Sequence, residues 1–304
     1  MNRFQKIVAL DRTGLNRWGE QACQALAETC VFYQDIPQTD QEKIRRLQDA
    51  DALLVSYRTP VSGDVLRRCK KLRYIGLCCS LYSPESCNVD LAAAKELGLT
   101  VTGIFDYGDE GVIEYELAAL IQLLHGFGGE IWKGSPRELG GLQVGIIGLG
   151  TVGIKLARAL KFFGSELYYY SRTRKPEVEA ELGITYLALP PLLETCDVVS
   201  THLPRNTYLL DDTLFSHFSG GKILINTSLG PTFELQAIKK WLKQDPNNRY
   251  LCDKCGMGLD LSLEGVPGVL YTGRGSGASI QSTQRLNEKV IANAKAFLKT
   301  EPLL

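Results

Sequence analysis

The sequence has no net charge, because its 34 lysine and arginine residues balance its 34 aspartate and glutamate residues. It therefore lacks the basic footprint with which proteins bind nucleic acids and anionic membranes. Long hydrophobic runs are missing too, since stretches such as residues 117–124 are far shorter than the roughly 20 residues of a membrane helix. We expect neither a nucleic acid nor a membrane as a partner.

Cysteine usage and the N-terminus bear on the compartment. The nine cysteines are odd in number and scattered along the chain, which indicates free thiols in a reducing environment. At the N-terminus, polar residues lead directly into the short apolar run 7–10, which is typical of a strand and not of a signal-peptide core. Together with an ordinary hydrophobic content of 44%, these features predict a cytoplasmic globular protein.

The first hundred residues alternate short apolar runs with amphipathic stretches, and no internal repeat is visible in the 304 residues. Predicted strands span residues 7–10, 30–33, 51–56, 72–77 and 100–102, and predicted helices span residues 15–29 and 91–97. This alternation predicts a parallel sheet with crossover helices.

A long apolar helix is predicted over residues 111–125, followed by a connector over residues 126–141 that is rich in glycine, proline and charge. Strand–helix alternation then restarts, with strands predicted at 144–147, 167–170, 198–201, 222–226 and 250–253 and a last amphipathic helix at 282–298. The chain is therefore expected to form two α/β domains.

The strongest motif is the glycine pattern 148–153, GLGTVG, which follows an apolar strand directly and opens a predicted helix. Gly148 permits the tight turn, Gly150 lets the backbone approach a pyrophosphate, and Gly153 lets the helix pack close to the strand. The N–H groups and dipole of the helix N-terminus favour phosphate. The context favours a dinucleotide-binding Rossmann unit over a glycine turn that binds nothing.

The next strand ends in three tyrosines, and Ser171 follows. An NAD-selective site has an acidic residue here that binds the adenosine ribose hydroxyls. This chain has Ser171-Arg172-Thr173-Arg174 instead. A hydroxyl and two guanidinium groups can bind a 2′-phosphate that a carboxylate would repel. The segment therefore favours NADP(H) over NAD(H), although both arginines could also be solvated loop residues.

Several further segments are similar to sequence motifs of one known protein family and occur in the same order along nearly the whole chain. They are residues 71–76, 88–92, 96–101, 138–139, 197–200, 202–204 and 225–227. In these segments the sequence resembles the D-isomer-specific 2-hydroxyacid dehydrogenases. The resemblance implies a Rossmann doubly wound parallel sheet, residues 106–276, inserted in a second, flavodoxin-like α/β substrate domain of residues 1–105 plus 277–304. It also implies hinges near Phe105 and Ser276, and a homodimer whose interface is formed by the helices after Gly108.

The resemblance also implies where catalytic residues belong. Oxidation of a 2-hydroxy acid needs hydride transfer to nicotinamide, a histidine base oriented by a carboxylate, and an arginine for the substrate carboxylate. At the family's arginine, glutamate and histidine positions this sequence has Leu229, Gly258 and Arg274. Leucine cannot hydrogen-bond a carboxylate, and arginine stays protonated. Arg274 is left as a candidate to hold a substrate carboxylate or a developing negative charge.

The chain offers only three histidines as replacements. His202 belongs to the His-Leu-Pro turn beside the cofactor, His125 ends the long helix, and His217 lies in a polar surface stretch. We expect structural roles for all three. In the loop between Gly76 and Asn88, longer than the family's glycine-rich turn, Ser80 or Tyr82 could instead donate a proton.

The cysteines raise the possibility of a metal or redox site, because Cys252 and Cys255 form a Cys-x-x-Cys and Cys78, Cys79 and Cys87 lie in the substrate loop. The sequence has no second Cys-x-x-Cys and no nearby histidine that would complete a zinc pattern. The preferred interpretation is that Cys252 is a buried free thiol on a strand, and no metal is predicted.

The predicted cofactor-binding residues are Gly148, Gly150, Thr151, Val152, Gly153, Ser171, Arg172, Thr173, Arg174, His202, Leu203, Pro204, Thr207, Thr227, Ser228 and Asp253. Two functions remain open. The first is an NADP(H)-dependent oxidoreductase with altered chemistry that acts on an unidentified small carbonyl, imine or carboxylate compound. The second is a non-catalytic NADP(H)-binding sensor or assembly protein. Ordinary dehydrogenation of a D-2-hydroxy acid ranks third, because loss of such residues removes several orders of magnitude in rate.

Overall fold

The computed structural model describes residues 2–258 and 261–300, and the chain divides into two compact units. Unit 1 consists of residues 1–107 and 279–304, and unit 2 consists of residues 108–278. The sequence predicts these boundaries after residues 105 and 276, and in the structure each lies two residues later, after residues 107 and 278. Each unit has its own parallel sheet.

Unit 1 is built on a five-stranded parallel sheet of order β2-β1-β3-β4-β5, which is the flavodoxin-like order. Its strands are β1 (Phe4–Ala9), β2 (Ala27–Phe32), β3 (Ala52–Val55), β4 (Tyr74–Leu77) and β5 (Thr100–Thr102). Its helices are α1 (Arg17–Leu26), α2 (Asp40–Leu47), α3 (Gly63–Arg68), α4 (Leu91–Glu96) and α12 (Ile280–Thr300), with a 3-10 turn η1 (Pro84–Ser86).

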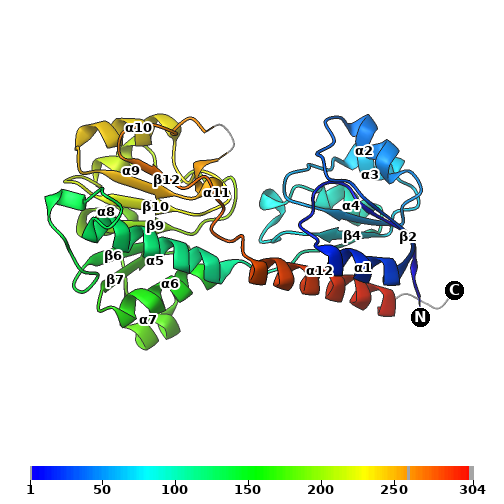
Figure 1. Ribbon diagram of the computed structural model, residues 1–304, viewed down its shortest axis with the longest axis horizontal. Coiled ribbons are helices and arrows are strands. Elements are labelled where there is room, and N and C mark those ends of the chain that lie inside the picture. The colour runs from blue at the N-terminus through cyan, green and yellow to red at the C-terminus, as the bar shows by residue number, and fades with distance from the viewer. Residues whose placement is uncertain (1, 259–260, 301–304) are drawn as a thin grey trace. The chain divides into compact units, whose positions relative to one another are not determined.

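Helices cover both faces of this sheet, which explains why its central strand is apolar throughout. All four residues of β3 are buried, and successive side chains face opposite layers. Leu53 packs into the layer with α2, α3 and α4, and Leu54 packs into the layer with α1 and α12. α1 and α12 lie side by side, although they are far apart in the sequence (Figure 1).

Unit 2 is built on a seven-stranded parallel sheet of order β12-β11-β10-β9-β6-β7-β8. Its strands are β6 (Gln143–Ile147), β7 (Glu166–Tyr170), β8 (Thr185–Tyr186), β9 (Val198–Thr201), β10 (Ile223–Asn226), β11 (Arg249–Cys252) and β12 (Val269–Tyr271). Its helices are α5 (Asp109–His125), α6 (Thr151–Phe162), α7 (Pro176–Leu182), α8 (Leu189–Thr195), α9 (Asp212–Ser216), α10 (Leu235–Gln244) and α11 (Lys254–Met257), with a 3-10 turn η2 (Trp132–Gly134).

The strand order of unit 2 is that of a doubly wound dinucleotide-binding sheet with one further strand at its edge. β6 lies inside the sheet next to β9, and the order reverses between these two strands. Ile146 packs into the layer that contains α5 and α6, and Ile147 packs into the layer that contains α8 and α10. The predicted fold class, an α/β protein with two parallel sheets, is confirmed.

Some predicted element bounds are wrong. The helix predicted over residues 15–29 ends at Leu26, because Ala27 is already extended (φ −137°, ψ 162°) and begins β2. The last helix is longer than predicted and spans Ile280–Thr300. No helix in the parts of the chain that the structure describes is long and apolar enough to cross a membrane.

Candidate functional site

The turn after β6 can only be formed by glycine. Gly148 has φ +98°, and its N–H donates to the carbonyl oxygen of Tyr170 at the end of β7 (2.8 Å). A Cβ at this position would lie 2.2 Å from the carbonyl oxygen of His202, which follows β9. The turn is therefore pressed between two neighbouring strand ends, and a side chain would separate them.

The next two glycines of the motif have different surroundings. A Cβ on Gly150 would meet nothing within 4 Å, so the backbone is open there, whereas a Cβ on Gly153 would lie 2.4 Å from the carbonyl oxygen of Gly148. α6 begins at Thr151 without a side-chain cap. The N–H groups of Thr151 and Val152 are therefore available to a ligand. The cradle fits the pyrophosphate of a dinucleotide.

The loop after β7 contains the residues predicted to select the cofactor. Arg174 forms two hydrogen bonds to the Glu179 carboxylate (3.0 and 2.5 Å) and packs over the Tyr186 ring. Within the described residues, the guanidinium of Arg172 has no ion-pair partner, and it is exposed. The Ser171 hydroxyl donates to the carbonyl oxygen of Thr173 (2.5 Å). Arg172 is therefore the arginine best placed for a phosphate.

The strand ends of β9 and β10 surround a buried carboxylate that the sequence analysis missed. Glu116, on α5, accepts a hydrogen bond from the Ser200 hydroxyl at Oε2 and one from the Thr227 hydroxyl at Oε1, each 2.7 Å long. The Ser200 Oγ lies 3.1 Å from Nε2 of His202. Burial lowers the pKa of His202, although the nearby Glu116 opposes that effect. His202 is thus a neutral member of this network.

The loops after β9 and β10 are tied together by Ser228. Its hydroxyl donates to the carbonyl oxygen of Thr201 and accepts from the N–H of Leu203, both at 3.1 Å. The buried Asn226 side chain accepts from the N–H of Ser228 and donates to the carbonyl oxygen of Gly230. Predicted cofactor residues in these loops, including the half-buried Pro204 and Thr207, therefore lie at the same carboxyl edge of the sheet, where a doubly wound sheet has its ligand crevice.

Asp253, directly after β11, is a buried carboxylate with three donors. Its Oδ1 accepts from the N–H of Gly256 (2.8 Å) and caps α11. Its Oδ2 accepts from the N–H and the hydroxyl of Ser276 (2.7 and 2.8 Å). The carboxylate fixes the segment near 276 to the strand end, and a carboxylate can accept further donors from a ligand.

The residues at the family's arginine, glutamate and histidine positions, Leu229, Gly258 and Arg274, lie in loops of unit 2. Leu229 is half-buried after β10, and Gly258 has φ +81°, a conformation that favours glycine. Arg274 is exposed, and its carbonyl oxygen accepts from the N–H of Lys254. The loop 272–274 is closed by the Thr272 hydroxyl, which donates to the same carbonyl oxygen (3.2 Å).

The thiols near these loops are not arranged as a metal centre. Cys252 is fully buried, and burial raises its pKa to about 12, while Cys255 is half-buried. In unit 1, Cys78 and Cys79 are buried and Cys87 is half-buried. Among the described residues, no group of three or more metal-binding side chains comes together.

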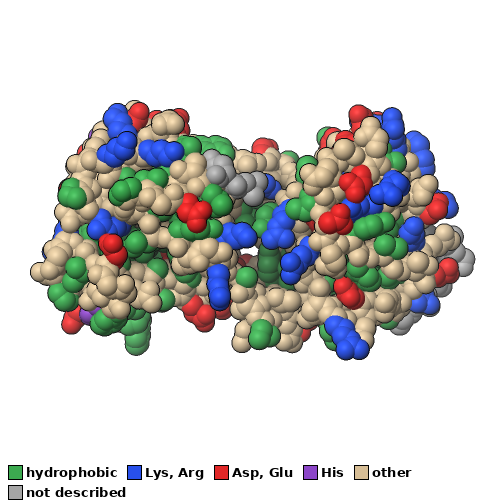
Figure 2. Space-filling view, turned by 45° about the horizontal axis from the view of Figure 1, so that its top comes forward, with side chains coloured by type: hydrophobic (Ala, Val, Ile, Leu, Met, Phe, Trp, Pro, Cys, Tyr) green, Lys and Arg blue, Asp and Glu red, His purple; other side chains and the backbone are tan. Residues whose placement is uncertain are grey.

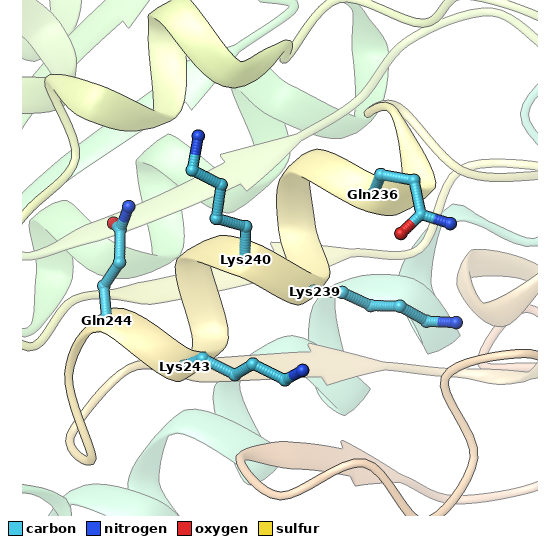
Figure 3. Close-up of a pocket in the computed structure, with 5 residues that line it drawn as sticks. All are labelled: Gln236, Lys239, Lys240, Lys243 and Gln244. Carbon is cyan, nitrogen blue, oxygen red and sulfur yellow. The ribbon is translucent and has the colours of Figure 1, made fainter.

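The other two histidines lie away from these strand ends. His217 Nδ1 pairs with Oε1 of Glu194 (2.6 Å), and the His125 ring stacks on Phe127 with centroids 4.9 Å apart. A shallow depression in unit 2 lies on the exposed face of α10, between lysine and glutamine side chains (Figure 3). On the face drawn in Figure 2, basic and acidic side chains are interspersed. Neither feature supports a competing site.

Comparisons with known proteins agree with this geometry. Residues 128–256 match the family model of the D-isomer specific 2-hydroxyacid dehydrogenase, NAD binding domain. A hydroxypyruvate reductase of Blautia hydrogenotrophica is 28% identical over an alignment that covers 98% of each chain. A D-lactate dehydrogenase of Escherichia coli is 33% identical over 64% of this chain and 62% of its own length.

Solved structures share the fold of the whole chain. The apo D-lactate dehydrogenase from Escherichia coli superposes with a TM-score of 0.79 at 24% identity, covering 98% of both chains. An acyclic imino acid reductase in complex with NADPH and D-Arg superposes with a TM-score of 0.83 at 22% identity, also over 98% of both chains.

Proposed function

The family match and the homologues support the D-isomer specific 2-hydroxyacid dehydrogenase family, and from that premise we propose that the protein is an NADP(H)-dependent oxidoreductase of small carboxylates. Unit 2 is the dinucleotide-binding domain in this proposal, and unit 1 is the substrate domain. The observation that carries it is the Gly148 turn, which admits no side chain and leads into the uncapped N-terminus of α6. Such a turn holds the pyrophosphate of a dinucleotide.

The preference for NADP(H) rests on the loop after β7. This loop has no carboxylate at Ser171, and Arg172 is exposed beside it. A guanidinium gives a 2′-phosphate charge-assisted hydrogen bonds. Arg174 contributes less in this proposal, because Glu179 already holds it in a two-point contact.

The chemistry is proposed to differ from ordinary 2-hydroxyacid dehydrogenation, because Leu229, Gly258 and Arg274 replace the family's arginine, glutamate and histidine. When bound, the cofactor supplies the hydride. Arg274 is the proposed catalytic residue, since its permanent positive charge can bind a substrate carboxylate or a developing oxyanion.

The substrate class follows from the relatives' names. The hydroxypyruvate named for one relative is a 2-oxo acid, and the imino acids named for the reductase of similar fold carry a C=N group where a 2-oxo acid has C=O. We therefore propose a 2-oxo or 2-imino acid as the compound that is reduced.

A substrate panel tests this function. NADPH oxidation is followed at saturating cofactor with hydroxypyruvate, glyoxylate, pyruvate, and the same acids mixed with ammonia or methylamine. We expect turnover of at least one compound, and Arg274→Ala should lower kcat/KM about a hundredfold or more. Arg274→Lys is the matched control, because it keeps the charge and loses the two-point geometry. Tight NADPH binding without any turnover would contradict the enzyme and favour the sensor.

The quaternary structure is proposed to be a homodimer formed through unit 2. Phe127 and Phe162 are 74% and 85% exposed at the ends of α5 and α6, although both rings are apolar. Large exposed aromatic side chains are typical of protein interfaces.

A further inference from the structure

The crevice of unit 2 has two halves that bind different parts of a dinucleotide. In a doubly wound sheet each half binds one mononucleotide, and the glycine turn and the ribose-recognition position belong to the adenosine half. Here that half is β6, β7 and β8, so β9, β10 and β11 form the half for the nicotinamide nucleotide. Glu116 lies against the ends of β9 and β10, and it therefore belongs to the nicotinamide half.

The Glu116 carboxylate is buried without a cation. Its side chain is 0% exposed, and both of its oxygens accept hydroxyl hydrogens, from Ser200 and Thr227. In the parts of the chain that the structure describes, no lysine or arginine pairs with it. His202 lies 3.8 Å away, and burial lowers the pKa of this imidazole, which keeps it neutral. Two hydroxyls and a neutral imidazole leave the negative charge uncompensated.

Other titratable groups around Glu116 add no positive charge. Tyr115, its neighbour on α5, has its pKa raised by burial and by the acidic side chains Cys252, Asp253 and Glu116 nearby, and it carries no positive charge. Asp253 is itself a buried carboxylate, but it accepts three hydrogen bonds, from the N–H of Gly256 and from the N–H and hydroxyl of Ser276. Among the described residues, the titratable side chains next to Glu116 therefore bring it no positive charge, and Glu116 accepts fewer hydrogen bonds than Asp253 does.

A buried charge without a counter-ion raises the free energy of the folded protein. Binding of a ligand that brings the opposite charge is therefore favoured. Thr227 is the residue through which Glu116 can act on a bound nucleotide. Its hydroxyl donates its hydrogen to Glu116, so its oxygen can only accept from any other partner, and the residue is half-buried directly after β10. The site thus presents acceptors and negative charge where the nicotinamide nucleotide is expected.

We propose that Glu116 makes this site prefer the oxidised, positively charged nicotinamide ring over the neutral reduced ring, and so favours reduction of the substrate. The inference rests on the proposed function, because it requires a dinucleotide in the crevice. Loss of a hydride, a proton with two electrons, to the carbon of a carbonyl or imine leaves the ring with one positive charge, and the substrate heteroatom takes a proton from solvent or a donor. Glu116 stabilises that charge as it forms.

The test measures cofactor affinity, and it needs no substrate. Dissociation constants for NADP⁺ and NADPH are determined by calorimetry for the full chain and for Glu116→Gln, which keeps the size of the side chain, removes its charge and replaces one acceptor oxygen with an NH2 donor. We expect the variant to bind NADP⁺ about tenfold more weakly, because one unit charge in a partly buried site changes affinity by that order. Its affinity for NADPH should change by less than about twofold, because the reduced ring is neutral.

Two controls separate the charge from other effects. Glu114→Gln removes the same charge from the exposed side of α5 and should leave both constants within about twofold of wild type. 2′-Phospho-ADP-ribose, which lacks the nicotinamide, should bind Glu116→Gln and wild type equally. If Glu116→Gln does not fold, Glu116→Met removes the charge with an apolar side chain of similar length and gives the same readout.

The possible results test the role of Glu116 separately from the proposed oxidoreductase function. Equal losses for NADP⁺ and NADPH, or no loss for either, would overturn the role of Glu116 and leave the oxidoreductase intact. If the wild-type chain binds neither cofactor, the proposed function itself fails. A selective loss of NADP⁺ affinity supports both.

Discussion

At the residue scale, two glycines of one motif have opposite tolerance for a methyl group. A Cβ on Gly153 would lie 2.4 Å from a backbone oxygen, whereas Gly150 (φ −88°) has open space around it. We expect Gly153→Ala to lower the free energy of unfolding by about 1–3 kcal/mol, as overpacking does. Gly150→Ala should stay within about 0.5 kcal/mol of wild type. Urea unfolding measures both, and equal stabilities would contradict the packing described for Gly153.

In the proposed NADP(H) site, Arg172 and Arg174 are both exposed, and of the two only Arg174 has an ion-pair partner among the described residues. Arg172→Ala should weaken NADPH binding about tenfold and leave NADH binding unchanged, because only NADPH carries the 2′-phosphate. Fluorescence titration of the reduced cofactors measures both constants.

Arg174→Ala is the matched control for that experiment. Because Arg174 is held by Glu179, its loss should weaken NADPH binding less than the loss of Arg172. The opposite ranking would assign the phosphate to Arg174.

At the scale of elements, the end of β9 makes stability dependent on pH. Burial lowers the pKa of His202 from its ordinary 6.5, so the unfolded chain takes up a proton that the folded imidazole resists. Stability should therefore fall as the pH drops below about 6.5. Between pH 7.5 and 5.5, wild type should lose more free energy of unfolding than His202→Gln in denaturant unfolding. Parallel losses in the two proteins would mean that His202 does not titrate in this way.

The elements that could be predicted from the sequence are those with a strong local pattern. The buried strand β3 is a continuous apolar run, and the glycine turn lies between a strand and a helix. The end of α1 could not be placed, because the stretch 27–29 has no stop signal and becomes a strand only by pairing with β1. The edge strand β8 is two residues long and has too little pattern to detect.

Glu116 shows why part of the site was missed. It lies on the buried stripe of α5, between Ile113 and Leu120, so one charged residue interrupted an otherwise regular apolar face. That interruption was the available signal. Its partners Ser200 and Thr227 are 84 and 111 residues away in the chain, and only the folded sheet brings their hydroxyls together.

At the scale of the whole molecule, the proposed homodimer predicts a concentration-dependent mass. Phe162, 85% exposed at the end of α6, is the side chain whose exposure a partner would most reduce. Phe162→Glu should weaken association at least tenfold in sedimentation velocity, since it places a charge in an apolar interface. Trp18→Glu, at a 50% exposed site in unit 1, is the control and should not change association. A monomeric wild-type chain would contradict the dimer.

Calorimetric titration of the full chain with NADPH and NADH tests directly whether unit 2 binds NADP(H). We expect one NADPH bound per chain with a dissociation constant in the micromolar range or below. We also expect NADH binding at least about tenfold weaker, because the loop after β7 offers Arg172 and no ribose-binding carboxylate. Tighter binding of NADH would contradict the assigned cofactor, and binding of neither nucleotide would contradict the site itself.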